Sequence, residues 1–232
     1  MNKYAIIVAG GEGNRAGGSV PKQFQLIGGI PMLWWSVRAF HKEDPKTRII
    51  LVLHPGFFDY WETLSAELPE EDQKIKVHIS CGGRSRLESV KNGLMSVDNT
   101  ADCYVAVHDA ARPMLTPELI KEGWENACKY NAAIPVVEMT SSLRRLEPEG
   151  SIAVPRKDYV EVQTPQFFSS GLLISAYNQP LVDTMTDDAS VVEAAGAKVS
   201  LFKGYPYNIK VTNNLDIKIA ELLMMQLQYD FS

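Results

Sequence analysis

The chain has 232 residues, which is long enough to bury one substantial core and too short to predict two large independent domains. Its 23 Lys and Arg residues and 28 Asp and Glu residues leave a formal net charge of -5. The sequence therefore argues against nucleic-acid binding, which usually requires a basic stripe. A local cationic site for a small anion is still compatible with this charge, because net charge does not report how charges cluster.

The three cysteines, Cys81, Cys103 and Cys128, lie at wide spacings. An odd number without a CxxC pair indicates neither a disulfide framework nor a metal or redox site, and predicts reduced thiols of a cytosolic protein. The first residues lack the pattern of a signal peptide, and no window reaches the roughly 18 apolar residues of a spanning helix. We therefore expect a cytoplasmic protein that does not bind a membrane.

Short apolar runs bounded by turn residues recur along the chain. Most are rich in Val and Ile and lack strict alternation, which is typical of strands covered on both faces. These predicted strands cover residues 4–9, 49–53, 76–79, 103–107 and 132–137.

Helical segments separate the strands. Pro31 begins a predicted helix that ends at Phe40, and Thr116 caps another whose first residue is Pro117. Later come a helix over 187–195 that stops at Gly196, a strand over 198–202 and a last helix over 215–228. The apolar stripe of the last helix is expected to face the core, and it consists of Leu215, Ile219, Leu222, Leu223 and Leu227. This alternation predicts an α/β fold with a doubly wound, mostly parallel sheet.

The alternation breaks between residues 138 and 166, where polar residues and the prolines Pro148, Pro155 and Pro165 occur. The pattern fits an excursion from the sheet better than another βα unit. We therefore predict a single domain over residues 1–232 with a projecting β-arm over 138–166.

Small residues follow the first predicted strand, in Ala9-Gly10-Gly11-Glu12-Gly13-Asn14-Arg15 and, farther on, Pro21-Lys22-Gln23. Glycines there let the backbone approach a ligand and direct N–H groups at phosphate oxygens, although an ordinary strand-to-helix turn also uses them. Arg15 and Lys22 could stabilise charge on a phosphoryl group during transfer, and solvated surface cations are the alternative. The segment lacks the ending of a Walker A loop and fits the dinucleotide fingerprint poorly.

Further motifs follow in order: Gly82-Gly83-x-x-Arg86-x-x-Ser89-Val90, His108-Asp109-Ala110-Ala111-Arg112-Pro113, Gln163-Thr164-Pro165-Gln166-Phe167, Thr186-Asp187-Asp188-Ala189-Ser190 and Asn208-Ile209-Lys210-Val211-Thr212. With the glycine-rich segment they resemble the 2-C-methyl-D-erythritol 4-phosphate cytidylyltransferases of the isoprenoid pathway. The resemblance implies a nucleotide-binding fold and a homodimer with interlocking arms. It also implies attack of a polyol phosphate oxygen on the α-phosphorus of CTP, with Mg2+ held mainly by the CTP phosphates.

The resemblance also implies residue roles. Arg15 and Lys22 match positions that stabilise the transition state, and Arg156 and Lys210 match positions that hold the polyol phosphate. The remaining binding positions are Ala9, Gly10, Gly11, Gly13, Gly82, Gly83, Ser89, Asp109, Ala110, Arg112, Thr164 and Thr186. No residue is assigned to direct metal binding, and no histidine to catalysis.

Several of these residues have structural alternatives. Gly82, Gly83 and Ser89 could form an ordinary turn with a helix cap, and Asp109 could cap a loop or pair with Arg112. Arg156 and Lys210 could be solvated surface charges, and Thr164 and Thr186 could be turn or N-cap residues.

The arm departs from the family pattern, which leaves open whether Thr140 or Ser142 contacts the polyol. A relative acting on ribitol 5-phosphate is therefore an alternative. A dinucleotide-binding oxidoreductase is a second alternative, and it predicts an acidic residue after the second strand, where Leu53-His54 offers none. A catalytically inactive nucleotide-binding protein is a third.

Overall fold

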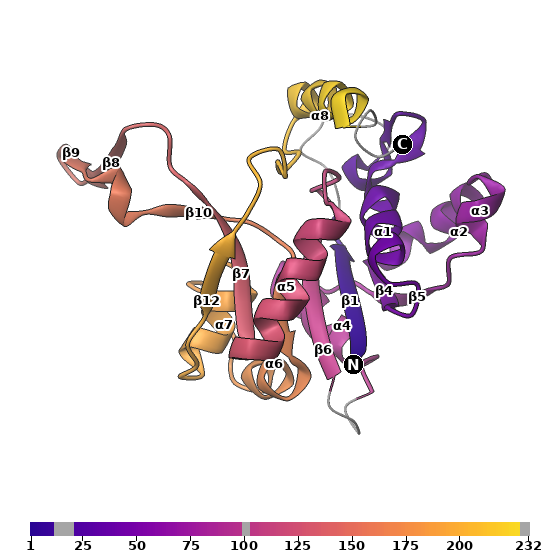
Figure 1. Cartoon of the computed structure of the whole chain (residues 1–232), viewed down its shortest axis with the longest axis horizontal. Coiled ribbons are helices and arrows are strands. Elements are labelled where there is room, and N and C mark those ends of the chain that lie inside the picture. Colours follow the sequence, from indigo (N-terminus) through magenta and orange to yellow (C-terminus); the bar gives the residue numbers. More distant parts are fainter. Residues whose placement is uncertain (12–20, 99–102, 228–232) are drawn as a thin grey trace.

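A computed structural model describes residues 1–11, 21–98 and 103–227 of the chain. Its centre is an eight-stranded sheet in the order β10-β7-β11-β6-β1-β4-β5, with β12 also paired to β7 (Figure 1). The strands of this sheet are β1 (Asn2–Ala9), β4 (Arg48–Leu53), β5 (Val77–Cys81), β6 (Cys103–Asp109), β7 (Ala132–Glu138), β10 (Val160–Val162), β11 (Gln166–Ser169) and β12 (Ser200–Lys203).

The sheet is mixed and mostly parallel. β1 is paired in parallel with both β4 and β6, β4 with β5, and β7 with β12, whereas β10 and β11 run antiparallel to their neighbours. The register places Val8 opposite Asp109 and Ala9 opposite Leu53. The carboxyl ends of β1, β4, β5 and β6 therefore meet at one edge, which is where open α/β sheets bind ligands.

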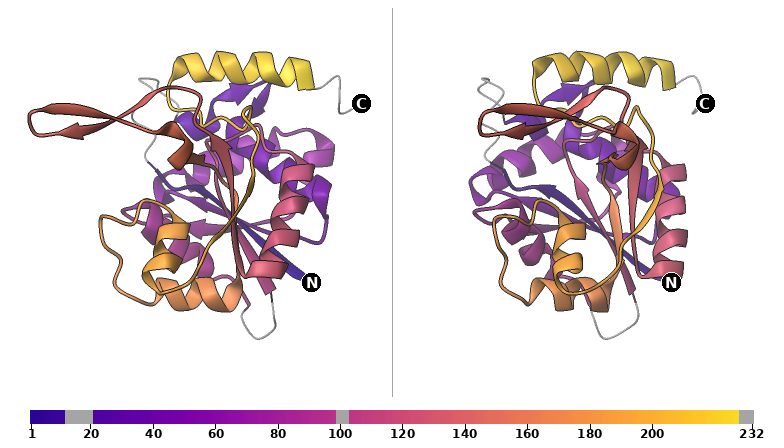
Figure 2. Two further views of the ribbon diagram at one scale, coloured as in Figure 1. Left: turned by 60° about the vertical axis from the view of Figure 1, so that its left-hand side comes forward. Right: turned by 90° about the vertical axis from the view of Figure 1, so that its left-hand side faces the viewer.

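Helices cover both faces of the sheet (Figures 1 and 2). Their bounds are α1 (Met32–Glu43), α2 (Phe58–Ala66), α3 (Glu70–Gln73), α4 (Arg86–Leu94), α5 (Pro117–Tyr130), α6 (Ser170–Tyr177), α7 (Asp188–Ala194) and α8 (Asn214–Leu227). One core includes Ile7 with side chains of α1 and α5, and a second includes Ile6 with side chains of α4, α6 and α7. Alternate residues of β1 thus face opposite cores, as expected of a strand buried on both faces. The predicted α/β class with a doubly wound sheet is confirmed.

Local sequence signals explain where several helices begin. Thr116 accepts a hydrogen bond from the backbone N–H of Leu119, with Pro117 as the first residue of α5, as predicted. Asp187 caps α7 in a reciprocal capping box with Ser190. Pro31 precedes α1, which continues three residues past the predicted end.

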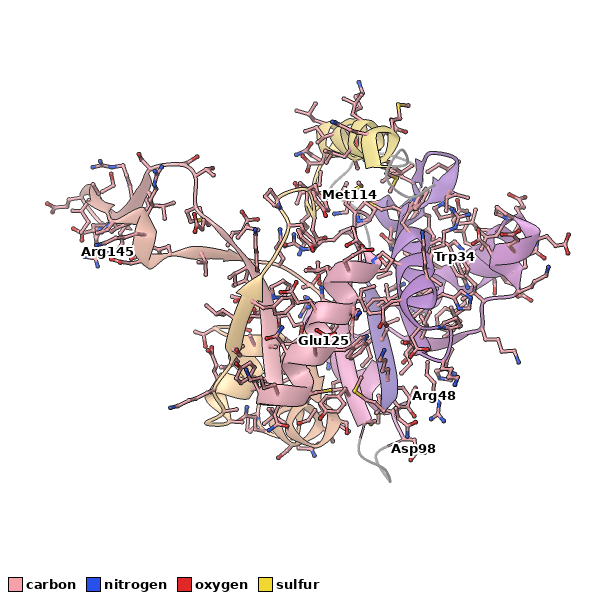
Figure 3. The ribbon with its side chains drawn as sticks, viewed as in Figure 1. Trp34, Arg48, Asp98, Met114, Glu125 and Arg145 are labelled. Carbon is pink, nitrogen blue, oxygen red and sulfur yellow. The ribbon has the colours of Figure 1, made fainter. Side chains whose placement is uncertain are left out.

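The projecting segment is a hairpin of β8 (Leu143–Glu147) and β9 (Gly150–Val154), which extends away from the sheet in Figures 1 and 2. Figure 3 shows Arg145 on this hairpin. The end of the predicted arm is wrong, because β10 pairs with β7 and β11 pairs with β6 inside the main sheet. β10 has only three residues, Val-Glu-Val, and all are exposed, so it is too short to show the apolar run of an interior strand. A single domain over the whole chain stays a prediction.

The predicted core stripe of α8 is wrong at three positions. Leu215 and Leu222 are more than 60% exposed and Ile219 is 39% exposed, while Ala220 and Met224 are buried. The buried face packs on β2 (Leu26–Ile27), which pairs with β3 (Ile30–Pro31), and on the loop after β12. Leu223 of the predicted stripe also packs in this contact, whereas Ala220 and Met224 lay outside the leucine-based pattern. No helix of the described ranges is long and apolar enough to cross a membrane.

Candidate active site

Two glycine-containing loops touch at the carboxyl edge of the sheet. The Cα atom of Gly82, directly after β5, lies 3.2 Å from where a Cβ atom on Gly10 would be, and the hydroxyl oxygen of Ser89 lies 2.8 Å from the same point. A side chain at position 10 would therefore force one of the two loops to move. Glycine at position 10 therefore allows two backbones to approach closely, which an ordinary strand-to-helix turn does not require.

The loop between β5 and α4 is held by internal hydrogen bonds. Ser85 caps α4, and the Ser89 hydroxyl accepts from the N–H of Gly83 and donates to the carbonyl of Ser85. Ser89 thus lies one turn inside α4 and holds the loop through its hydroxyl group. The structure brings Gly10, Gly82, Gly83 and Ser89 together, and their contact with a nucleotide stays a prediction.

Lys22 and Gln23 lie beside the same edge in a short 3-10 helix, Lys22–Phe24. The amide of the buried Gln23 donates to the carbonyls of Ala9 and Gly11, which ties this helix to the end of β1. The ammonium of Lys22 donates to the carbonyl of Val211 at 2.6 Å. Lys22 is therefore held next to the loop that carries Lys210. Arg15 and Gly13 lie outside the described residues.

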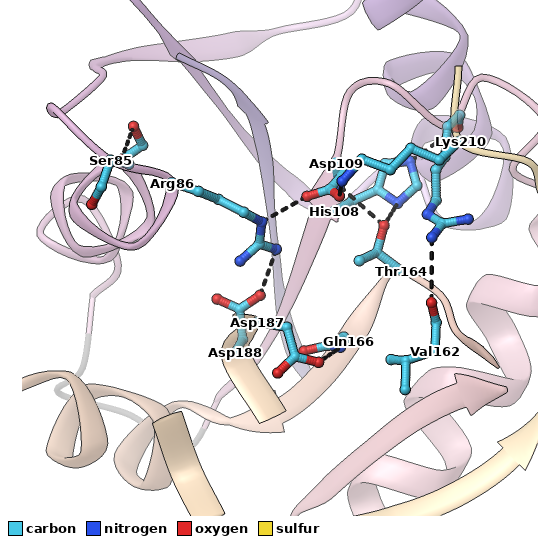
Figure 4. Close-up of polar contacts among 12 residues, drawn as sticks. Ser85, Arg86, His108, Asp109, Val162, Thr164, Gln166, Asp187, Asp188 and Lys210 are labelled. Carbon is cyan, nitrogen blue, oxygen red and sulfur yellow. Dashed lines mark hydrogen bonds and ion pairs between the residues drawn. The ribbon is translucent and has the colours of Figure 1, made fainter. Parts of the chain in front are cut away.

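Asp109 at the end of β6 is the centre of an ion-pair cluster (Figure 4). One carboxylate oxygen accepts from Nε of Arg86 at 2.8 Å, and the other from Nζ of Lys210 at 2.6 Å. Burial alone would raise the pKa of Asp109. The charges of Arg86 and Lys210 outweigh it and hold that pKa below its ordinary range. Asp109 is therefore a carboxylate in the pH range of enzymes. Arg112 bonds the backbone carbonyl of Asp109 through its own N–H, and its guanidinium donates elsewhere.

The guanidinium of Arg112 instead ties the end of β10 and the loop after β12 to this edge. Its Nη1 donates to the carbonyl of Asn208 at 2.7 Å and its Nη2 to the carbonyl of Val162 at 3.3 Å. The guanidinium is buried, and burial lowers its pKa. Ala110, also buried, donates its backbone N–H to the carbonyl of Val8. These two predicted binding positions thus keep the edge in shape, and their contact with substrate stays a prediction.

Thr164 is buried between two residues of β6. Its hydroxyl oxygen accepts from the backbone N–H of Asp109 at 3.1 Å and lies 3.1 Å from Nδ1 of His108. Its carbonyl accepts from the amide of Asn208. Asn208 and Thr164 thereby connect the loop of Lys210 to β6, so that three segments distant in sequence form one site. Thr186 is exposed directly before the Asp187 cap, so it is not itself the N-cap of α7.

The hydrogen bond that Arg156 makes does not involve the Asp109 cluster. Arg156 is exposed in the short 3-10 helix Arg156–Asp158 and donates from Nη1 to the carbonyl of Thr140 at 2.6 Å. This contact places the backbone of Thr140 beside Arg156, and the role of Arg156 at a polyol phosphate stays a prediction.

Three residues of the site have no role predicted from the sequence. They are Arg86, His108 and Asp188, and each lies within one of the motifs. Their position within the motifs could have identified them as site residues. Motif spacing does not predict that Arg86 contacts both Asp109 and Asp188. Across residues 1–11, 21–98 and 103–227, no group of three or more His, Cys, Asp or Glu side chains is placed to hold a metal ion.

Comparison with known proteins gives consistent matches. The sequence profile of the family described as 2-C-methyl-D-erythritol 4-phosphate cytidylyltransferase matches residues 4–226. The chain is 45% identical over 224 residues to a protein of that description from Phocaeicola vulgatus, and 44% identical to one from Bacteroides fragilis. Each match covers 97% of this chain and 100% of the relative. A crystal structure of the enzyme from Thermus thermophilus has a TM-score of 0.75 and 30% identity, covering 96% of this chain and 98% of that one.

Proposed function

Since this chain belongs to the 2-C-methyl-D-erythritol 4-phosphate cytidylyltransferase family, it is a nucleotidyltransferase, and we propose how its described residues join CTP to that polyol phosphate. The observation that carries the proposal is the meeting of Lys22, Lys210 and Asp109 at the same sheet edge as the glycine contact. Cations and exposed N–H groups at the end of a parallel sheet suit two phosphorylated substrates. Family membership does not favour the oxidoreductase or the ribitol 5-phosphate alternative.

In the proposed reaction a phosphate oxygen of the polyol attacks the α-phosphorus of CTP. The new P–O bond forms as the bond from the α-phosphorus to the bridging oxygen breaks, and its electrons leave on pyrophosphate. In this proposal Lys22, together with Arg15, stabilises charge that develops on the phosphoryl oxygens. Lys210, with its ammonium oriented by Asp109, holds the attacking phosphate, so positioning and charge supply most of the catalysis.

We propose that Mg2+ enters bound to the CTP triphosphate. Both oxygens of Asp109 are engaged by cations, so this carboxylate does not suit a metal ligand. When bound, the ion neutralises part of the triphosphate charge, and Mg2+ commonly keeps water and substrate phosphates as ligands.

We also propose a homodimer formed through the arm. The hairpin exposes apolar side chains, with Leu146 84% and Ile152 40% exposed. Tyr159, Val160 and Val162, farther along the chain, are exposed as well. Such side chains on a projecting element suit contact with a second copy. We propose that this contact brings Arg156 of an arm to a bound polyol phosphate.

We propose a cytoplasmic location, which the free cysteines Cys81, Cys103 and Cys128 support.

The proposal is tested by measuring pyrophosphate release by the purified chain. CTP with 2-C-methyl-D-erythritol 4-phosphate should give turnover, whereas CTP with ribitol 5-phosphate, and UTP or ATP with either polyol, should give little. Faster turnover with ribitol 5-phosphate would reassign the substrate. Absence of pyrophosphate release with every nucleotide and polyol pair, in buffer that contains Mg2+, would refute the proposed reaction.

A further inference from the structure

Four charged side chains form one alternating chain behind the proposed site (Figure 4). Asp188 accepts from Nη2 of Arg86 at 2.7 Å, Arg86 donates from Nε to Asp109 at 2.8 Å, and Asp109 accepts from Lys210 at 2.6 Å. Two carboxylates and two cations balance. The chain links α7, α4, β6 and the loop before α8 at the sheet edge.

Burial changes along this chain of charges. The side chain of Asp188 is 0% exposed and also accepts from the hydroxyl of Tyr177, whereas the side chain of Lys210 at the other end is 44% exposed. One end is therefore anchored in the core and the other reaches solvent. Three consecutive ion pairs connect the ammonium of Lys210 to the buried Asp188, so this ammonium has little freedom to move.

Stability alone does not explain Arg86. Its Nη1 atom is buried and has no hydrogen-bond partner among the described residues. A buried unsatisfied N–H group is unfavourable, and buried ion pairs are often no more stabilising than apolar packing. Arg86 thus combines a free-energy cost with contacts that fix the carboxylate of Asp109.

From this geometry we propose that Arg86, anchored by Asp188, is a positioning residue that fixes the Asp109 carboxylate and, through it, the Lys210 ammonium. The inference deepens the proposed function and rests on it for the role of Lys210. Arg86 acts through Asp109 and does not itself need to touch substrate.

The kinetic test replaces the anchor pair without leaving a buried charge. Arg86→Gln alone would leave the carboxylate of Asp188 unpaired and could unfold the chain, so the variant is Arg86→Gln with Asp188→Asn. We expect kcat to fall by about 30-fold or more and the KM for the polyol phosphate to rise, since small misplacements can cost 100-fold. The KM for CTP should stay within about threefold, because the glycine contact is untouched.

A matched control pair joins α1 to α3. Arg38 of α1 donates to both oxygens of the buried Asp72 at 2.5 to 3.1 Å, and this pair lies outside the proposed site. Arg38→Gln with Asp72→Asn should lower the melting temperature by a comparable amount and leave kcat within about threefold of wild type. An equal loss of kcat in the control pair would mean that any lost Arg–Asp pair impairs the enzyme, which would overturn the proposal.

A double-mutant cycle separates positioning from a general structural effect. If Arg86 acts through Asp109, adding Arg86→Gln and Asp188→Asn to Asp109→Asn should cost less than about threefold further in kcat/KM. Losses that multiply would overturn the proposal, as would wild-type kcat in the Arg86→Gln, Asp188→Asn variant.

A readout independent of activity keeps the two proposals distinguishable. In wild type, the hydrogen-bonded ammonium of Lys210 should give an observable 1H–15N signal by NMR, assigned with Lys210→Arg, and the paired substitution should broaden it. Wild type that releases no pyrophosphate would refute the proposed function only. An unchanged Lys210 signal in the Arg86→Gln, Asp188→Asn variant would refute the positioning role only.

Discussion

His108 should make the folded protein less stable in acid, although it has no assigned catalytic role. Its ring is fully buried at the end of β6, with Nε2 lying 3.2 Å from the carbonyl of Arg112 and Nδ1 lying 3.1 Å from the hydroxyl of Thr164. A carbonyl can only accept, so Nε2 carries the proton and Nδ1 accepts from Thr164. Protonation of Nδ1 would reverse that bond, so the Thr164 hydroxyl oxygen, which already accepts from the N–H of Asp109, would have to accept a second hydrogen bond and direct its own proton elsewhere.

The magnitude follows from the pKa of His108. Burial lowers it to about 3 from an ordinary value of 6.5, and the positive charges of Arg112 and Arg86 add to this, although Asp109 opposes them. Because the folded-state pKa is depressed, the unfolded chain binds more protons below pH 6.5. The contribution of His108 is therefore complete above that pH and is lost as pH falls toward 3. Between pH 8 and pH 5 the free energy of unfolding should fall by about 2 kcal/mol from this residue alone.

Urea unfolding of wild type and His108→Gln at pH 8 and pH 5, at one protein concentration, isolates this contribution. Glutamine is neutral at both pH values, and the other titrating groups are shared. Wild type should therefore lose about 2 kcal/mol more than the variant on going to pH 5. Equal losses in the two proteins would refute a neutral, buried His108. So would an NMR titration in which the ring of His108 protonates near pH 6.

Three other substitutions test separate parts of the site and the assembly. Lys22→Ala should lower turnover by roughly 100-fold or more, and unchanged kinetics would remove its transition-state role. Gly10→Ala should weaken thermal stabilisation by CTP because a Cβ atom would lie 2.8 Å from the hydroxyl of Ser89, whereas Gly171→Ala, with no neighbour within 4 Å, should not. Leu146→Lys on the exposed arm should shift the protein from dimer to monomer by light scattering. Leu222→Lys, on the exposed face of α8, should not.

Sequence patterns predicted the interior of this fold better than its periphery. The buried strands β1, β4, β6 and β7 were found to within two residues at each end, because runs of Val and Ile bounded by turns are typical of interior strands. β10 and β11 were missed, although Phe167 and Phe168 of β11 are buried, since both strands are short and lie at the end of a polar, proline-containing segment. For α8, helical periodicity was present on more than one face, and only the position of the neighbouring loop decides that Ala220 and Met224 are buried.

The candidate site was predictable to the extent that it lies in local motifs. The motifs placed Gly10 and Lys22 on one segment and Asp109, Thr164 and Lys210 on three others, and the parallel sheet explains why these segments meet at one edge. The partner of each charge was not predictable. Asp109 has a guanidinium three residues away at Arg112, yet it pairs with residues 23 and 101 positions away, at Arg86 and Lys210.

The reason for that preference lies in competing demands on Arg112. Its guanidinium donates to the carbonyls of Asn208, in the loop after β12, and Val162, at the end of β10. Asn208 is fully buried, and a buried carbonyl without a donor is costly, so the arginine nearest in sequence is engaged by backbone and the carboxylate takes its cations from elsewhere. Because one of these cations is Lys210, held in turn by the loop that Arg112 fastens, the shape of the edge and the position of the ammonium depend on each other.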